Sequence, residues 1–267
     1  MDRPLARSNE MTVTALDTGT TNAYLLEADG GYLLIDTGYE EDYDAFRAEL
    51  DAAGVDVREI EYLLLTHHHD DHVGFANDLL DGVTVIAHEA AAPLLRAGEN
   101  ARLGGGLLNR RVYYLAMLRS WVRPEWDLTF SPVTLREDDV LVTGDDDAAL
   151  RELGIDGSIR HTPGHTPDSI SLLLDDGRLL CGDAAMNRFR WAGTRFHTIY
   201  IADLGRYYES WRTIIDSGAH TVYPAHGEPF DVDRLRANLG AYDEGDLIGQ
   251  DPIAARYATF DGNDPNA

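Results

Sequence analysis

Histidine and aspartate crowd into one short run of this chain, Thr66-His67-His68-His69-Asp70-Asp71-His72. The run directly follows the apolar stretch Tyr62-Leu63-Leu64-Leu65, an order typical of a buried strand that leads into a loop at its C-terminal edge. Because side chains alternate in an extended segment, His67 and His69 point the same way, about 7 Å apart, and can hold one cation. Asp71 and His72 turn away from that line and can reach a second cation beside the first.

Two other interpretations of the run are a purification tag and ordinary polar residues at the surface. Tags lie at chain termini and lack flanking acids. Surface histidines would be scattered, whereas four of the ten histidines of this chain lie within six positions. Imidazole and carboxylate are the usual ligands of zinc and its neighbours, so the run predicts a metal site.

Three later segments each place a further ligand type just beyond an expected strand. Prolines and a glycine fix a tight loop over residues 161–167, a short apolar strand ends in Gly-Asp at 182–183, and another strand and turn precede residue 226. Loops at strand ends on a rigid sheet are where sites are usually built. The candidate ligands in these segments are His165, Asp183 and His226.

Taken together, these residues resemble the metallo-β-lactamase superfamily of hydrolases. The resemblance rests on the pattern His-x-His-x-Asp-His at residues 67–72, on the three later ligands in the expected order, and on Leu34-Ile35-Asp36-Thr37-Gly38, which looks like the early strand and turn of that family. It covers the chain from about Thr12 to about Phe230. The motifs are specific as a set, although each alone would be weak.

The resemblance implies a ligand set and a branch of the family. The residue that would bridge two metal ions is Asp183, and an Asp at that position resembles the glyoxalase II and lactone-hydrolase branches, so β-lactam hydrolysis is less expected. His69 argues against the flavodiiron branch, which carries Glu there. The implied cofactors are two divalent ions, with zinc expected first and iron or manganese also compatible. Metal one would take His67, His69 and His165, metal two would take Asp71, His72 and His226, and Asp183 would bridge them.

These ligands predict a chemistry. Two divalent cations about 3.5–4 Å apart can share one water and convert it to hydroxide near neutral pH. Two carboxylates and a hydroxide leave the pair of ions slightly positive, which favours the negative oxygen that develops on an attacked carbonyl or phosphoryl group. No nucleophilic Ser or Cys is required. Asp71 could orient the hydroxide or accept its proton, so it is the candidate catalytic residue.

Other polar residues near these motifs have weaker interpretations. For His68 we favour a supporting or surface role over ligation. Asp36 is equally well interpreted as the partner of a ligating histidine or loop amide and as a turn-forming residue before Thr37. His197 lies in a loop that could overhang the site. The histidines expected to be structural or near a helix start are His88, His161 and His220.

Composition narrows the class of protein. The chain has 267 residues with 44% hydrophobic content, enough for one large domain with a real core. No apolar run approaches a membrane span, the first eight residues lack the apolar core of a signal peptide, and the single Cys181 cannot form an internal disulfide. We therefore expect a cytoplasmic enzyme.

The net charge of −25 arises from 47 acidic residues against 22 basic ones, all of which are arginine. Such a charge repels phosphate backbones and anionic membranes, so we expect no nucleic-acid or membrane partner, and a tRNA-processing role is disfavoured. Acid-rich, lysine-free composition favours a salty cytoplasm, as in halophilic archaea, where salt screens the self-repulsion. The alternative is a high-GC genome with an acidic proteome.

The expected architecture is an α/β fold, the four-layer αββα sandwich that the resemblance implies. Short strands over residues 12–35 precede a helix with Tyr43, Phe46 and Leu50 at helical spacing, a helix begins near Gly74, and Asp203 is the expected N-cap of a helix over residues 204–214. This order suggests helices outside two packed sheets. Residues 1–240 would form the hydrolase domain and residues 241–267 a loosely held tail.

Residues 93–131 do not fit the sandwich and form an expected helical insertion. Gly104-Gly105-Gly106 is a candidate hinge, and aromatic residues follow with arginines between them. A second aromatic and basic segment, 186–197, follows Asp183. The insertion could be a lid or substrate wall, a helical hairpin packed on the sandwich, or a contact of a homodimer.

The leading functional hypothesis is a dinuclear metal hydrolase that cleaves an ester, thioester or lactone of a small molecule. Arginine clusters in so acidic a chain suggest an anionic substrate. Met186 stands where lactone hydrolases of the family often place Tyr, which weakens the lactone hypothesis. The alternatives are a phosphodiesterase, a persulfide dioxygenase with one iron, and a binding module without catalysis. The last two would not need the full set Asp71, His72 and His226.

Overall fold

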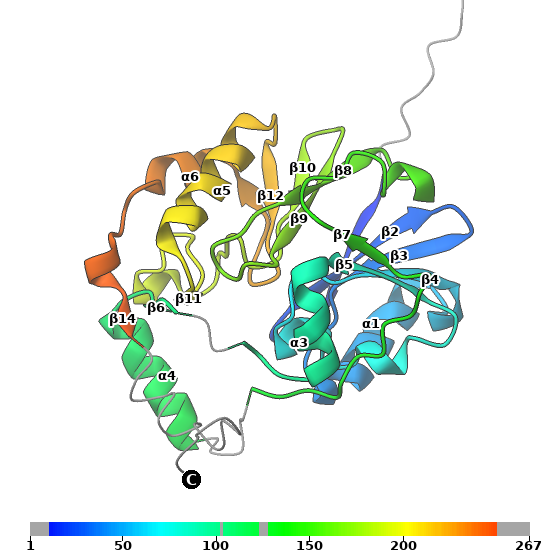
Figure 1. The fold of residues 1–267 in the computed structure, drawn as a ribbon, viewed down its shortest axis with the longest axis horizontal. Helices are drawn as coiled ribbons and strands as arrows, with labels where there is room; N and C mark the ends of the chain where they lie inside the picture. Colours follow the sequence, from blue (N-terminus) through cyan, green and yellow to red (C-terminus); the bar gives the residue numbers. More distant parts are fainter. Residues whose placement is uncertain (1–10, 102–103, 123–127, 250–267) are drawn as a thin grey trace, which may run out of the picture.

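The protein is described by a computed structural model over residues 11–101, 104–122 and 128–249 (Figure 1). One large sheet has six strands in the order β1-β2-β3-β4-β5-β7, and its last four strands run parallel to one another. The strands of this sheet are β1 (Val13–Asp17), β2 (Asn22–Ala28), β3 (Gly31–Ile35), β4 (Ile60–Leu64), β5 (Thr84–His88) and β7 (Val140–Val142).

A second large sheet has five strands in the order β13-β12-β10-β9-β8. The predicted hairpin around Asp175-Asp176-Gly177 joins two of them, with Leu180 paired to Leu172. The strands are β8 (Gly157–His161), β9 (Ile170–Leu174), β10 (Arg178–Leu180), β12 (Thr221–Tyr223) and β13 (Phe230–Asp231).

Alternation along the strands explains why the two sheets stack. In β2, Tyr24 and Leu26 join a buried cluster that also contains Leu172 and Leu174 of β9, so this cluster lies between the sheets. Leu25 points the opposite way, into a cluster with residues of the outer helices. Because side chains of a strand point alternately to its two faces, a strand that is apolar throughout is buried on both faces.

Helices cover the two outer faces. Phe46 and Leu50 of α1 (Tyr43–Ala53) and Leu95 of α3 (Ala92–Ala97) pack on the six-stranded sheet. Trp211 of α5 (Leu204–Asp216) and Leu235 of α6 (Asp233–Asn238) pack on the five-stranded sheet. Figure 1 shows α1 and α3 on one side of the stacked sheets and α5 and α6 on the other. The expected αββα sandwich is confirmed, as is Asp203 as the N-cap of α5.

The short helix α2 (Asp70–Val73) corrects one prediction. The sequence predicted that a helix begins near Gly74, but α2 ends there. Glycine is required at this point because a Cβ on Gly74 would lie 2.4 Å from the backbone nitrogen of Glu40. The helix instead begins within the histidine run, and it brings the His72 ring to 4.1 Å from the His67 ring between centroids.

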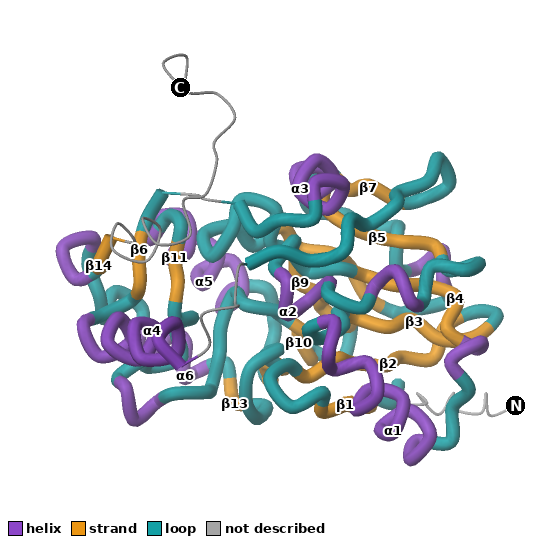
Figure 2. Tube along the Cα trace, turned by 90° about the horizontal axis from the view of Figure 1, so that it is seen from below, coloured by secondary structure: helices purple, strands orange, loops and turns teal. Residues whose placement is uncertain are grey.

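A third sheet lies at one end of the molecule and includes part of the insertion. It has the order β11-β6-β14, built from β11 (Tyr200–Ile201), β6 (Gly106–Leu107) and β14 (Ile248–Gly249) (Figure 2). The helix α4 (Arg110–Val122) follows β6. Val112 of α4 is buried in the cluster under α5, whereas Leu118 and Trp121 are exposed.

Two of the three glycines in the candidate hinge at 104–106 are tightly packed, which gives them a reason other than hinge motion. Gly105 has φ +81°, and a Cβ there would lie 2.0 Å from the carbonyl oxygen of Ile201. Gly106 is paired within β6, and a Cβ there would lie 2.6 Å from the carbonyl oxygen of Ile248. These residues are glycines because the backbones of β11 and β14 approach them closely.

We predict that Gly105→Ala lowers the free energy of unfolding by about 2–3 kcal/mol, because a left-handed φ disfavours alanine and the methyl group meets a backbone oxygen. Gly104→Ala is the matched control, since nothing lies within 4 Å of its Cβ position. We expect the control to change stability by less than about 0.5 kcal/mol. Urea denaturation followed by circular dichroism measures both, and equal stability of the two variants would restore the hinge interpretation.

Part of the predicted tail is packed rather than loose. Ile248 pairs with Leu107, and the Tyr242 ring meets the His197 ring at 5.1 Å between centroids. Residues 250–267 of that tail lie outside the described residues, as do Arg123 and Trp126 of the insertion. Within the described ranges, each helix is too short or too polar to cross a membrane.

Candidate metal centre

Four strand ends deliver the candidate ligands to one place at the junction of the two large sheets. The histidine run follows β4, and the loop after β3 holds it because both the backbone N–H and the hydroxyl of Thr37 donate to the carbonyl oxygen of His72 (2.8 and 2.9 Å). From the second sheet, His165 lies in the loop between β8 and β9, Asp183 follows β10 and His226 follows β12. The candidate ligands therefore meet at the edge where these strands end.

His67, His69 and His165 form the first group. Nε2 of His165 lies 3.1 Å from Nε2 of His67 and 3.0 Å from Nδ1 of His69. All three rings are close, with centroids 4.6–4.7 Å apart. The chain thus directs one nitrogen of each ring to a common point.

The outer nitrogens show which ring atoms carry protons. Nδ1 of His165 donates to the carbonyl oxygen of Tyr200 at 2.9 Å, so its Nε2 is a bare lone pair when the ring is neutral. The Thr66 hydroxyl gives its proton to Asp36 and must accept from Nδ1 of His67 at 3.2 Å. Two lone pairs therefore face each other at 3.1 Å between His67 and His165. A cation between them would be bound by both.

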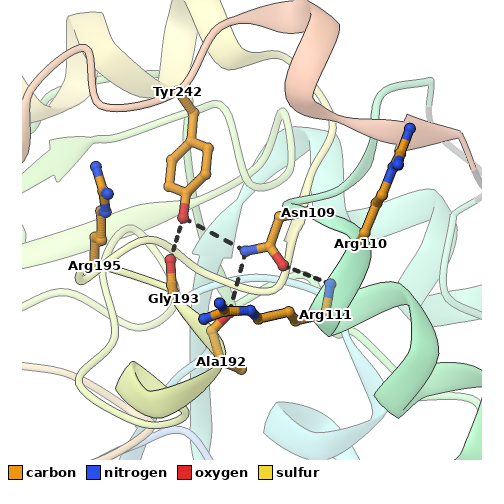
Figure 3. Close-up of a pocket in the computed structure, with 7 residues that line it drawn as sticks. All are labelled: Asn109, Arg110, Arg111, Ala192, Gly193, Arg195 and Tyr242. Atoms are coloured by element: carbon orange, nitrogen blue, oxygen red, sulfur yellow. Dashed lines mark hydrogen bonds between the residues drawn. The ribbon is translucent and has the colours of Figure 1, made fainter.

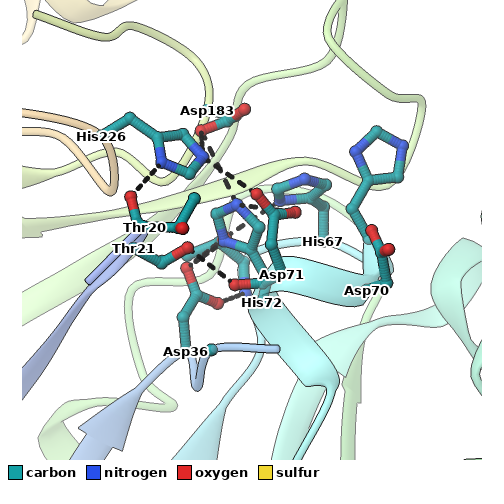
Figure 4. A network of polar contacts seen from close by, with 12 residues as sticks. Thr20, Thr21, Asp36, His67, Asp70, Asp71, His72, Asp183 and His226 are labelled. Atoms are coloured by element: carbon teal, nitrogen blue, oxygen red, sulfur yellow. Dashed lines mark hydrogen bonds and ion pairs between the residues drawn. The ribbon is translucent and has the colours of Figure 1, made fainter. Parts of the chain in front are cut away.

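Asp71, His72 and His226 form the second group (Figure 4). Nε2 of His226 lies 3.3 Å from Oδ2 of Asp71, and Nε2 of His72 lies 3.8 Å from Oδ1 of Asp71. The outer nitrogens are again fixed, because Nδ1 of His72 donates to Asp36 (2.8 Å) and Nδ1 of His226 donates to the carbonyl oxygen of Thr20 (2.9 Å).

Asp183 lies between the two groups and presents one oxygen to each. Its Oδ2 lies 3.6 Å from Nε2 of His165, while its Oδ1 lies 3.3 Å from Nε2 of His226 and 3.7 Å from Nε2 of His72. The Thr198 hydroxyl donates to Oδ2 at 3.1 Å and orients the carboxylate. This is the position that the sequence predicted for a bridging residue.

Burial keeps the first group in the form that binds metals. It lowers the pKa of His67 and His69 well below the usual value for histidine and also lowers the pKa of His165. These imidazoles are therefore neutral at pH 7, as metal coordination requires.

Carboxylates dominate the electrostatics of the second group. Burial lowers the pKa of His72, but Asp36, Asp71 and Asp183 outweigh it and raise the pKa to about 10. Burial raises the pKa of the Asp71 carboxyl, but His72 and His226 outweigh it, so Asp71 is ionised at neutral pH. The same charges that favour a proton on His72 favour a cation in its place.

Two buried atoms at the centre have the chemistry of metal ligands. Among the described residues, Nε2 of His72 and Oδ1 of Asp183 have no hydrogen-bond partner. A buried polar atom without a partner costs about 1–3 kcal/mol, so such atoms call for an explanation. The donor atoms are imidazole nitrogen and carboxylate oxygen, which divalent transition metals accept. These donor atoms form three overlapping groups, and within each group the ligand atoms lie within 4.8 Å of one another. Together the groups contain all seven predicted ligands, which are His67, His69, Asp71, His72, His165, Asp183 and His226.

A family model described as the metallo-beta-lactamase superfamily matches residues 16–226, a range that includes every one of these ligands. The chain belongs to the metallo-β-lactamase superfamily. The superfamily consists mostly of metal-dependent hydrolases, and its fold implies divalent metal binding.

Individual relatives are distant. The chain is 27% identical over 217 residues to the Beta-lactamase-like protein 2 homolog of Drosophila melanogaster. The aligned region covers 80% of this chain and 61% of the fly protein. It is also 26% identical over 229 residues to the probable metallo-hydrolase YqjP of Bacillus subtilis (strain 168), and that aligned region covers 81% of this chain and 70% of the bacterial protein. The chain therefore spans less than two thirds of the fly relative.

A solved structure shows the same fold. A metallo-beta-lactamase family protein from Thermus thermophilus superimposes with a TM-score of 0.59 and 22% identity over 86% of this chain and 78% of that chain. This likeness confirms the superfamily fold and says nothing about the substrate.

Asp36 is the main support of the candidate metallo-β-lactamase centre. Its Oδ2 accepts from His72 and from the Thr66 hydroxyl, and its Oδ1 accepts from the Thr66 backbone N–H at 2.7 Å. Both interpretations of Asp36 agree with the structure. It is the partner of the candidate ligand His72, and its φ of +58° is the left-handed conformation common in turns. The role of Thr66 was missed, although its place directly before the histidine run was a signal.

Of the two roles predicted for His68, the structure agrees with the supporting one and not with the surface one. His68 is fully buried, and its Nε2 accepts from the backbone N–H of Ala101 in the insertion. His197 does not overhang the site, because it is buried beside Tyr208, to whose hydroxyl its Nε2 is hydrogen-bonded. The insertion also supports the histidine run through Asn100, whose amide nitrogen donates to Asp70 at 2.8 Å.

Asp168, which the sequence did not single out, joins the two loops that carry the first group. Its carboxylate accepts from the backbone N–H of His68 at 3.0 Å and lies 2.9 Å from Nδ1 of the same residue. Both side chains are almost completely buried. Asp168 is three residues after His165, so this pair fixes the distance between the His165 loop and the histidine run.

We predict that Asp168→Ala lowers the free energy of unfolding by about 2–3 kcal/mol, because it leaves buried donors of His68 without an acceptor. Asp147→Ala is the control, since Asp147 is exposed and, within the described ranges, its ion pair is with Arg160; it should change stability by less than about 0.5 kcal/mol. Thermal and urea unfolding measure both. A loss no larger than that of the control would show that the His68 pair is dispensable.

Proposed function

We propose that this protein binds two divalent metal ions and hydrolyses an ester, thioester or lactone of a small molecule. The observation that carries the proposal is Asp183, whose two oxygens face two separate histidine groups. His67, His69 and His165 would hold one ion, and Asp71, His72 and His226 the other. Zinc is the ion that this donor set favours first, with iron and manganese also compatible.

When bound, the ions would supply a water acidic enough to attack a carbonyl carbon and a positive charge that stabilises the developing oxyanion. The residues of the chain have the complementary tasks. Asp71 is partly exposed and ionised, so its carboxylate can orient that water and accept its proton. Asp36 and the carbonyl oxygens of Tyr200 and Thr20 fix the ring orientations, so the donor nitrogens are already aligned.

The complete second group supports hydrolysis over the alternatives. Oxidation of a persulfide by one iron would need only the first group, whereas Asp71, His72 and His226 are gathered as well. A bridging Asp supports an ester, thioester or lactone rather than a β-lactam. Phosphodiester hydrolysis is compatible with the same centre, and no contact of the described residues favours it.

The test is metal quantification on purified protein, followed by a panel of thioesters, lactones, esters and phosphodiesters assayed in high salt. We expect two metal ions per chain and turnover of at least one carbonyl substrate, with activity lost in chelator and restored by added metal. One iron per chain together with oxygen uptake on a persulfide would replace hydrolysis with oxidation. Turnover of phosphodiesters alone would show that the substrate is a phosphodiester and not an ester, thioester or lactone.

A further inference from the structure

A pocket with a volume of about 340 Å³ lies between the start of α4, the loop at residues 192–195 and Tyr242 (Figure 3). It contains no candidate metal ligand. It is large enough for a group well beyond a single small ion, since ligand pockets begin at about 300 Å³. The residues that line it are Asn109, Arg110, Arg111, Ala192, Gly193, Arg195 and Tyr242.

The wall of the pocket is a network that joins three distant parts of the chain. The Tyr242 hydroxyl donates to the carbonyl oxygen of Gly193, and the Asn109 amide nitrogen lies 3.4 Å from the carbonyl oxygen of Ala192 and 3.5 Å from the Tyr242 hydroxyl. Asn109 also caps α4, because its Oδ1 accepts from the backbone N–H groups of Arg111 and Val112. The cap satisfies these donors, so the charge of the pocket comes from its arginines.

The arginines of the pocket face no acid within the described ranges. Arg110, Arg111 and Arg195, like several other described arginines, have no carboxylate within ion-pair distance, in contrast to Arg58 with Asp56 and Arg206 with Asp203. Among the described residues, no acidic side chain lines the pocket. The carboxylate of the nearby Asp243 accepts from the backbone N–H of Gly245. Although the whole sequence has a net charge of −25, the described residues thus contribute three arginines and no carboxylate to this pocket.

Arg195 is also held in an uncommon backbone conformation. Its φ is +50° and that of Phe196 is +72°, and both are values that few residues other than glycine adopt. Its guanidinium carbon lies 5.8 Å from the centroid of the Tyr242 ring, so the side chain stands beside another residue that lines the pocket. Such conformations persist where the surrounding structure fixes them, often at ligand-binding segments.

We propose that this pocket binds the phosphate group of an organic small molecule. Guanidinium groups bind phosphate through paired N–H donors, and a phosphate offers enough acceptors for more than one arginine. The rest of the molecule would lie against the Tyr242 ring and the backbone of Ala192 and Gly193. The site stands apart from the metal centre, so it can fail while the proposed hydrolase function holds.

The test is calorimetric titration of the metal-loaded protein with inorganic phosphate at low salt, where arginine–phosphate contacts are least screened. The test variant is the double substitution Arg111→Gln with Arg195→Gln. The matched control is Arg206→Gln with Arg236→Gln, which removes the same charge at exposed arginines outside the pocket. We expect the pocket variant to weaken phosphate binding at least tenfold and the control to leave it within twofold.

Three outcomes would overturn the proposal: no phosphate binding by the unmodified protein, equal weakening in both double variants, or binding unchanged by the pocket variant, which would place phosphate at the metal centre. All four arginines are exposed, and unfolding curves check that the variants fold. A second arm identifies the source of the phosphate. A higher KM for a phosphate-bearing thioester, with an unchanged KM for a neutral one, assigns the pocket to the substrate, and an unchanged KM for both assigns it to a separate ligand.

Discussion

We expect Asp183→Ala to abolish turnover of every substrate found for the unmodified protein. The carboxylate places Oδ2 within 4 Å of Nε2 of His165 in the first group and Oδ1 within 4 Å of Nε2 of His226 in the second. Its loss would separate the two ions and remove several kcal/mol of charge stabilisation, which corresponds to a fall in kcat of about a thousandfold or more. Steady-state kinetics and metal analysis on the same preparation measure both effects.

The matched control for Asp183 is Asp175→Ala. Asp175 lies in the turn between β9 and β10, its side chain is half exposed, and it pairs with Arg151. We expect this variant to keep full activity and full metal content. If Asp183→Ala kept the activity of the control, Asp183 would have no bridging role and the assignment of the seven ligands would be wrong.

Asp36→Ala has the largest expected effect on stability. The buried carboxylate accepts from His72 and from two groups of Thr66, all within 2.8 Å. Removing one partner of a buried charged pair costs about 3–5 kcal/mol, and we expect a loss of that size in the free energy of unfolding. The second metal group should also bind its ion about 10–100-fold more weakly, as is usual when the partner of a ligating histidine is lost.

Asp36→Asn separates the two contributions. Asparagine tolerates the φ of +58° and keeps the shape of the side chain, so it removes the charge without adding backbone strain. We expect a smaller loss of stability than for alanine and a similar loss of metal affinity. Urea denaturation of metal-free protein and competition with a chelator measure the two quantities. A stability loss below about 1 kcal/mol for Asp36→Ala would show that Asp36 only forms the turn.

The layers of the fold could be predicted because the apolar pattern of each strand indicates which of its faces are buried. Runs such as Tyr62-Leu63-Leu64-Leu65 are apolar on both faces, as is typical of a strand whose sheet is covered on both sides. The ends of α2 could not be predicted in the same way. Gly74 is compatible with either the start or the end of a helix, and the close backbone of Glu40 that decides the matter comes from another loop.

The seven candidate ligands could be named from sequence because ligand chemistry limits the residue types and their spacing. Their supports could not, because the hydrogen bonds come from residues of any type. Tyr200 and Thr20 act through carbonyl oxygens, which no side chain reveals. Asp168 lies 100 positions from His68 and pairs with it only after the loops meet.

The insertion shows the same limit. Its glycines suggested freedom of movement, because glycine is the residue of both flexible and crowded backbone. Only the approach of Ile201 and Ile248 shows that crowding is the reason. The Tyr242 segment was assigned to a loose tail by composition, yet pairing of Ile248 with Leu107 anchors it.

The division of the candidate ligands between the two large sheets has a consequence for biosynthesis. Four ligands lie within the histidine run, but the last, His226, is added more than 150 positions later. At the usual pace of translation this is a delay on the order of ten seconds or more. A chain still emerging from the ribosome would not hold the second ion in its complete set of ligands before His226 appears. The pool of metals that the released chain meets would then decide which ion it carries.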